Sequence, residues 1–173
     1  MKPIVIRQWV HANICVRDME KTIPFYEMLG FEKFDDQIFA EGAGVWAGLG
    51  LDTNRRFRAV FMKIPGDQPV PFLDIIQFLD KPTAGSAYPA LDNVGVGRLA
   101  FQIDNLEEAV AQLEANGVQL VGPISSYEVA PGVRPHGVDA RFVCFKDPDG
   151  TIIEYVQFAG DAGDILSSAA NPG

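Results

Sequence analysis

The chain contains few cysteines, few histidines and few basic residues. Two cysteines and two histidines occur among its 173 residues, and 14 lysines and arginines stand against 23 aspartates and glutamates. The resulting net charge of −9 argues against generic binding to nucleic-acid phosphates or anionic lipids. Cys15 and Cys144 lie in apolar strand patterns without a metal-type spacing, so we expect reduced core residues rather than a disulfide.

Long apolar runs are absent too. No segment is long enough to span a membrane, and the first residues, MKPIVIRQWVHANI, lack the continuous apolar core of a signal peptide. The glycine-rich stretch EGAGVWAGLG lacks the lysine followed by Ser or Thr of a phosphate-binding loop. We therefore expect a cytoplasmic protein with a small-molecule partner, and neither a nucleic-acid nor a membrane partner.

What the chain does contain is an internal repeat. Residues 11–31 (HANICVRDMEKTIPFYEMLGF) align with residues 98–118 (RLAFQIDNLEEAVAQLEANGV) at an offset of 87 positions, and residues 73–78 (LDIIQF) align with 153–158 (IEYVQF) at an offset of 80. In both copies of the longer segment, an alternating apolar run ends at a capping residue and leads into an amphipathic helix closed by a glycine. Two similar modules packed together are therefore expected.

Each module is predicted to contain a strand, a helix and three further strands. This pattern predicts an α+β fold of two tandem βαβββ modules, with a cavity between curved sheets. The expected boundaries are 1–80 for the first module, 81–92 for a linker, 93–160 for the second module and 161–173 for a tail, together forming one domain. Strands are predicted near 7–16, 34–40, 57–64, 71–79, 95–103, 119–121 or 125–129, 141–145 and 151–158, and helices at 19–29 and 106–115.

Side-chain alternation along these strands predicts which residues face inward. The repeat aligns His11 with Arg98 and Asp74 with Glu154, so packing of the two modules would bring these four side chains toward one centre. The complete set of polar or sulfur-bearing side chains on the predicted inner faces is His11, Asn13, Cys15, Asp74, Arg98, Gln102 and Glu154.

These segments resemble the vicinal-oxygen-chelate superfamily, which includes glyoxalase I, methylmalonyl-CoA epimerase, extradiol dioxygenases, and bleomycin- and fosfomycin-resistance proteins. The resemblance rests on HANICVRDMEKTIPFYEMLGF, LDIIQF, GVGRLAFQIDNLEEAVAQLEANGV and FKDPDGTIIEYVQF, which together cover nearly the whole chain in order. It implies the glyoxalase/bleomycin resistance/dioxygenase-like fold and a homodimer. It does not identify the reaction, because this scaffold hosts many chemistries.

The resemblance also implies a set of metal-ligand positions. Glyoxalase-like members take four ligands from the first, fourth, fifth and eighth strands, which correspond here to His11, Asp74, Arg98 and Glu154. A guanidinium has no lone pair for a cation, so Arg98 replaces the expected further ligand. Two arrangements stay open. Either His11, Asp74 and Glu154 weakly hold a divalent metal (Mn, Fe, Mg, Zn or Ni), or Arg98 supplies the positive charge and no metal is required. The chemistry of arginine favours the second.

The favoured function is a glyoxalase- or epimerase-like enzyme of the lyase or isomerase type. It would transfer a proton next to a carbonyl of a small, anionic, oxygenated or carboxylated metabolite, with Glu154 as base, Arg98 as clamp and His11 as ligand or acid. The alternative is a metal-free binding protein of the antibiotic-resistance type. A divalent-metal dioxygenase is a third possibility, which Arg98 disfavours because it stands at the place of a second histidine.

Further residues are candidates for contacts with a substrate. Trp46 is interpreted either as a mobile lid or as a packing anchor, and His136 either as an acid–base group or as a solvated loop residue. The arginines at 55, 56 and 58 either attract an anionic substrate or form a solvated edge. The predicted substrate-binding residues are Arg98, Asn13, Gln102, Trp46 and His136, and the aromatic side chains expected to stack on a ligand in a binding protein are Trp46, Phe72, Phe78 and Phe101.

Overall fold

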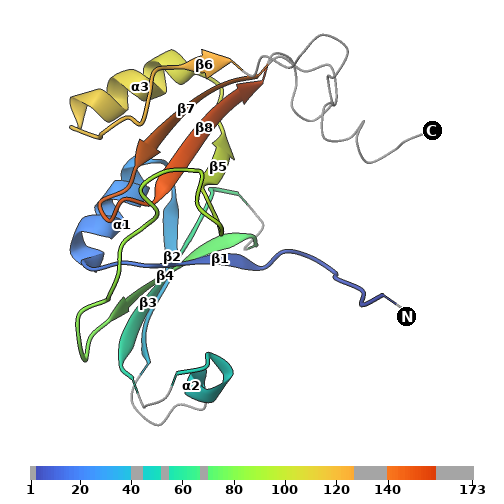
Figure 1. The fold of residues 1–173 in the computed structure, drawn as a ribbon, viewed down its shortest axis with the longest axis vertical. Coiled ribbons are helices and arrows are strands. Elements are labelled where there is room, and N and C mark those ends of the chain that lie inside the picture. The colour runs from blue at the N-terminus through green and yellow to red at the C-terminus, as the bar shows by residue number, and fades with distance from the viewer. Residues whose placement is uncertain (1–2, 40–44, 52–54, 67–69, 127–139, 159–173) are drawn as a thin grey trace. The chain divides into compact units, whose positions relative to one another are not determined.

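The structure, a computed structural model, describes residues 3–39, 45–51, 55–66, 70–126 and 140–158. The chain divides into two compact units, residues 1–85 and 86–173, at a boundary inside the predicted linker. Each unit contains a four-stranded sheet and a ten-residue helix (Figure 1). The predicted tail lies outside the described residues. In the ranges given above, no helix is long and apolar enough to cross a membrane.

Unit 1 contains a sheet with the strand order β1-β4-β3-β2, in which β1 and β4 are parallel and the other neighbours are antiparallel. Its elements are β1 (His11–Cys15), α1 (Met19–Met28), β2 (Glu32–Phe39), α2 (Val45–Gly48), β3 (Phe57–Lys63) and β4 (Phe72–Phe78).

Unit 2 repeats this topology with the order β5-β8-β7-β6, and β5 and β8 form its parallel pair. Its elements are β5 (Leu99–Gln102), α3 (Leu106–Ala115), β6 (Ser125–Ser126), β7 (Ala140–Lys146) and β8 (Ile152–Phe158). The predicted α+β fold of two similar modules is therefore confirmed.

The two long helices begin in the same way. Asp18 caps α1 by accepting a hydrogen bond from the backbone of Glu20, and Asn105 caps α3 in the equivalent position. In addition, the side chain of Gln77 accepts a hydrogen bond from the first N–H group of α1, and Gln157 does the same for α3. The two glutamines stand 80 positions apart, so the repeat extends to the contacts that join each helix to its sheet.

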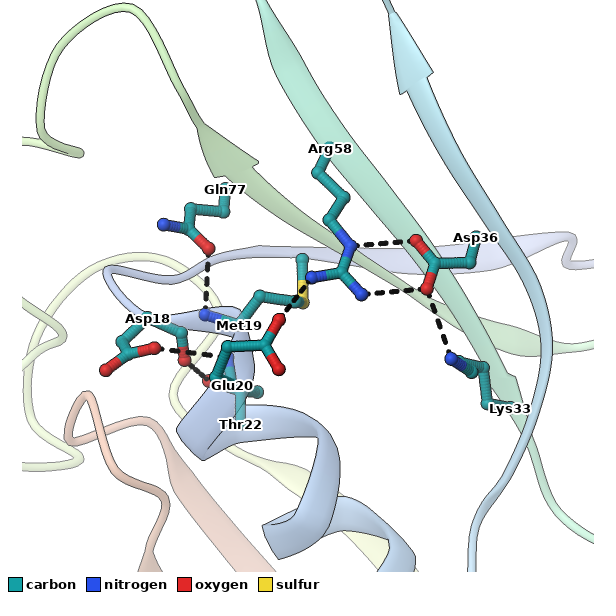
Figure 2. Close-up of polar contacts among 8 residues, drawn as sticks. All are labelled: Asp18, Met19, Glu20, Thr22, Lys33, Asp36, Arg58 and Gln77. Atoms are coloured by element: carbon teal, nitrogen blue, oxygen red, sulfur yellow. Dashed lines mark hydrogen bonds and ion pairs between the residues drawn. The ribbon is translucent and has the colours of Figure 1, made fainter.

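Ion pairs between a strand and a helix follow the repeat as well. Figure 2 shows that Arg58 of β3 binds both carboxylate oxygens of Asp36, at 2.8 Å each, and donates a further hydrogen bond to Glu20 in the first turn of α1. In unit 2, Arg141 of β7 pairs with Glu107 in the first turn of α3. Each helix is thus joined to its sheet by an arginine and a glutamate.

The prediction of a solvated arginine edge is wrong for Arg55 and Arg58. Arg55 pairs with Asp80 at 2.6 Å, and its guanidinium lies 4.3 Å from the ring centroid of Phe78. Both arginines are therefore paired with carboxylates of unit 1.

Several predicted elements need correction. β1 begins at His11 rather than near Arg7, and residues 3–10 are exposed and form no strand. The glycine-rich stretch, for which the sequence predicted no helix or strand, contains the short helix α2. Pro24 is the sixth residue of α1, so the carbonyl of Glu20 loses its usual helical partner. The sixth strand was expected at 119–121 or at 125–129, and each alternative is partly right. Leu120 forms an isolated bridge to Phe145, and β6 lies within the second range.

Replacing Asp36 with asparagine is expected to lower the free energy of unfolding at neutral pH by about 1 kcal/mol, a typical contribution for a partly exposed ion pair. Hydrogen bonds from Arg58 lower the pKa of Asp36 to about 2. Because this pKa lies below that of an unfolded chain, the stabilisation is present above the unfolded pKa and is lost as the pH falls toward 2.

Denaturant unfolding from about pH 7 to about pH 3 measures this contribution. Glu32→Gln, at an exposed carboxylate of the same strand, is the matched control. An effect of Asp36→Asn that does not shrink with falling pH would contradict the assignment.

Candidate functional site

One face of the sheet in unit 1 carries the polar residues of β1. In the parallel pair, His11 stands opposite Phe72, Asn13 opposite Asp74 and Cys15 opposite Ile76. Residues opposite each other in a ladder share a face. Helix α1 lies on the other face of the sheet. Gln77 of β4 points to that face and contacts the start of the helix. The predicted grouping of His11, Asn13 and Asp74 on one face therefore agrees with the strand register.

His11 and Asp74 form the first candidate pair. The Nε2 atom of His11 lies 3.9 Å from Oδ2 of Asp74, and the two side chains are 43% and 15% exposed. Asn13 donates a hydrogen bond of 2.9 Å from Nδ2 to the backbone carbonyl of Asp74, which ties the edge strand to β4. The imidazole ring also packs against Phe72, with ring centroids 5.3 Å apart. His11 is thus an accessible acid–base group that lies beside a carboxylate and an aromatic ring.

Burial governs the electrostatics around Asp74. It raises the pKa of the Asp74 carboxyl, against the lowering effects of Asn13 and His11. Partial desolvation by neighbouring groups, followed by the negative charge of Asp74, also raises the pKa of the Cys15 thiol. Cys15 is a free cysteine but is exposed, so its prediction as a core residue is wrong. The reason is its position on the edge strand, on the same face as His11 and Asn13.

Arg98 and Glu154 form the second candidate pair, in unit 2. The Nε atom of Arg98 lies 2.8 Å from Oε2 of Glu154, and the Glu154 side chain is only 4% exposed, against 37% for Arg98. The Sγ atom of Cys144 is 3.7 Å from the same carboxylate oxygen. Burial, followed by the charge of Glu154, raises the pKa of the Cys144 thiol. Cys144 is therefore a neutral, buried, free cysteine, as predicted.

The two pairs are equivalent under the internal repeat. Asn13 stands opposite Asp74 in the first parallel pair, and Ala100 stands opposite Glu154 in the second. His11 and Arg98 each lie two residues before these strand positions and contact the corresponding carboxylate. The structure therefore brings the four predicted residues together as two pairs, one in each unit.

The remaining predicted residues lie as follows. Gln102 is exposed on β5, opposite Val156. Trp46 is 4% exposed and packs edge-on against Phe57, with ring centroids 5.1 Å apart, so its contacts are those of an anchor within unit 1. Phe101 stands opposite Tyr155, on the face that does not carry Glu154, so its prediction as a stacking residue is wrong. His136 lies outside the described residues.

Sequence reasoning missed two members of an aromatic cluster beside His11. Phe34 and Phe61 both contact Phe72, with ring centroids 5.4 Å and 4.9 Å away. Phe61 stands opposite Asp74 in the antiparallel pair of β3 and β4. The alternation of β3 could have revealed Phe61, but Phe34 lies at a register shift between Lys33 and Asp35 that no sequence pattern indicated.

The two pairs differ in what they could hold. No cluster of three or more His, Cys, Asp and Glu side chains suited to a metal ion occurs within the described ranges. In unit 2 the buried carboxylate already contacts a guanidinium, which cannot act as a metal ligand. In unit 1 an imidazole and a carboxylate lie side by side, which is suited to proton transfer or to hydrogen bonding with a ligand.

Comparisons with known proteins agree with this topology. The family model of the Glyoxalase/Bleomycin resistance protein/Dioxygenase superfamily matches residues 8–155. The uncharacterized protein YaeR of Escherichia coli is 26% identical over 151 residues, which are 86% of this chain and 95% of that protein.

Solved structures show the same fold. A glyoxalase family protein from Bacillus cereus has a TM-score of 0.76 at 20% identity, covering 92% of this chain and 99% of that one. The trypanothione-dependent glyoxalase I of Leishmania major has a TM-score of 0.59 at 18% identity, covering 95% and 94% of the two chains.

Proposed function

Since the chain belongs to the Glyoxalase/Bleomycin resistance protein/Dioxygenase superfamily, we propose that it is a glyoxalase- or epimerase-like enzyme that transfers a proton next to a carbonyl group. Its substrate would be a small oxygenated or carboxylated metabolite. The observation that carries the proposal is the buried carboxylate of Glu154, bound by the partly exposed guanidinium of Arg98 at 2.8 Å. A buried carboxylate and a fixed cation are the two groups that abstraction of such a proton requires.

In this proposal Glu154 accepts the proton. The exposed part of the guanidinium would bind the substrate carboxylate or stabilise the negative charge that develops on the carbonyl oxygen. His11, which lies beside Asp74, stays a candidate acid–base group of unit 1.

A bound divalent metal, which the family resemblance implies, fits these residues poorly. Arg98 occupies one of the four ligand positions and offers no lone pair. It also places a positive charge within hydrogen-bonding distance of Glu154, a second ligand position, and this charge would repel a cation at the same carboxylate. We therefore propose that the reaction uses the charge of Arg98 and assign no step to a metal.

The proposed reaction class has a direct test. In deuterated buffer, an enzyme of this type exchanges the hydrogen next to the carbonyl of its substrate, and proton NMR measures the loss of that signal. We expect the protein to accelerate exchange in at least one member of a panel of 2-hydroxy and 2-oxo acids, acyl thioesters and hemithioacetals, and to do so in the presence of a chelator. If no member of the panel exchanged faster than in buffer, the proposed function would be refuted.

A binding protein without catalysis is the second candidate function. It is favoured by the aromatic cluster of Phe34, Phe61 and Phe72, since these rings offer stacking surface and Phe34 is 42% exposed. A buried Glu154 counts against it, because a purely apolar pocket does not need a buried charge. Saturable binding of a panel compound without hydrogen exchange would support this second candidate.

A further inference from the structure

An exposed apolar segment precedes β1 in the chain. We infer that this N-terminal arm, residues 3–9 (PIVIRQW), docks on a second copy of the chain, where it adds a strand to the outer edge of β2. Two copies would exchange their arms and form a closed homodimer. The inference concerns assembly, so it goes beyond the proposed proton transfer and does not depend on it.

The arm has the composition of a strand but is open to solvent. Ile4, Ile6 and Trp9 are 93%, 84% and 67% exposed, and Val5 is 80% exposed. In Figure 1 the arm leads away from β1, and it forms no strand. β-branched and aromatic residues favour strands, and a contiguous exposed apolar stretch is typical of an interaction site. The arm is therefore suited to pair with the edge of a sheet.

β2 offers the longest sheet edge in the part of the chain that the structure describes. The strand orders β1-β4-β3-β2 and β5-β8-β7-β6 make β1, β2, β5 and β6 the edge strands of the two units. β2 has eight residues, whereas β1, β5 and β6 have five, four and two. The outer backbone groups of an edge strand are a template for a further strand. Only β2 is long enough to pair with the whole arm.

Charge favours the arm over other partners for β2. β2 contains three acidic residues and one lysine, whereas the arm contains Arg7 and no acidic residue. Like charges oppose the pairing of β2 with β2 of another copy, and a basic arm is attracted to the same edge. Ile38 of β2 is 57% exposed and offers an apolar contact to the isoleucines of the arm. The two segments therefore complement each other in charge and in apolar surface.

The arm cannot pair along its full length with β2 of its own chain. β1 and β2 form opposite edges of one sheet, three strand spacings apart, which is about 14 Å. Crossing that distance would use about four residues of extended chain and leave about three for pairing. In a second copy, β2 can lie in line with the arm, so all of its residues are available. The geometry therefore favours exchange between two chains.

Sedimentation equilibrium of the full chain tests the role of the arm. We expect a homodimer whose dissociation constant rises by at least about 100-fold in the double variant Ile4→Asp, Ile6→Asp, because each arm loses two apolar contacts. Both isoleucines are exposed in the single chain, so the double variant should keep its fold. Ile64→Asp is the matched control, at an isoleucine that is 58% exposed and lies outside the arm and β2, and it should leave the dimer intact.

A mixture of two differently labelled copies identifies the edge that receives the arm. One copy is labelled for nitrogen–proton NMR. The other is unlabelled and carries a nitroxide at Ile4→Cys in a Cys15→Ser background, because Cys15 is exposed and Cys144 is buried. The nitroxide should broaden the amide signals of residues 32–39 in the labelled copy more than those of β1, β5 or β6. Only contacts between copies contribute, since the labelled copy carries no nitroxide.

Three outcomes would overturn the inference. They are a monomer at every concentration, a dimer that Ile4→Asp with Ile6→Asp leaves as tight as before, and broadening that is strongest outside β2. The sedimentation and broadening measurements on otherwise unaltered chains need no substrate. Their failure would therefore leave the hydrogen-exchange test of Glu154 intact, and failure of exchange would leave the arm intact.

Discussion

Glu154→Gln is expected to slow hydrogen exchange in the substrate by about 100-fold or more, within the range that general acid–base groups contribute. Glutamine has nearly the size of glutamate but cannot accept a proton from carbon. The side chain is buried and paired with Arg98, so the variant keeps the shape of the site while losing its proposed base. The exchange rate measured by NMR in deuterated buffer gives the effect directly.

The matched control is Glu114→Gln, at an exposed carboxylate of α3, which should exchange at the rate of the unaltered protein. Circular dichroism of Glu154→Gln would establish that the variant is folded. If a folded Glu154→Gln variant exchanged at a rate within about twofold of the unaltered protein, Glu154 would not be the base.

The second large effect concerns stability. Arg98→Met is expected to lower the free energy of unfolding by about 3 kcal/mol, because it leaves the buried carboxylate of Glu154 without its cation. This loss of stability is at the lower end of the range for broken buried ion pairs. Arg98 is partly exposed, so water screens part of its interaction with Glu154. Urea unfolding at neutral pH measures the change.

The double variant Arg98→Met, Glu154→Gln separates the ion pair from simple loss of packing. Removing both charges should restore part of the lost stability, so that the double variant is more stable than Arg98→Met alone. Arg56→Met, at an exposed arginine of unit 1, is the control and should change stability by less than about 0.5 kcal/mol. A double variant that is less stable than Arg98→Met would contradict the account of the pair.

The repeat made most of the fold predictable. The capped helix after an alternating strand occurs twice in the sequence, and both copies fold as predicted. The sequence also aligns the glutamines that bind the starts of α1 and α3, but it did not predict these contacts. The period of two along the strands also placed His11, Asn13 and Asp74 on one face. The roles of these residues in catalysis or substrate binding stay predictions.

The sequence predicted other features less well, each for a physical reason. Residues 7–10 share the alternation of β1 but form no strand, although the carbonyl of Val10 accepts a hydrogen bond from the backbone of Phe72 in β4, so the pattern overestimated the length of β1. Helix α2 has four residues, too few for a helical period to be visible. The pairing of Arg55 with Asp80 and of Arg58 with Asp36 depends on strand register, which composition does not reveal.

The central proposal is that the guanidinium of Arg98, and not a metal ion, supplies the positive charge at Glu154. Elemental analysis of protein purified without added metal, followed by the exchange assay after chelation, tests it most directly. The account predicts far less than one divalent ion per chain and an exchange rate that the chelator leaves unchanged. One tightly bound divalent ion per chain, whose removal abolishes exchange, would contradict it.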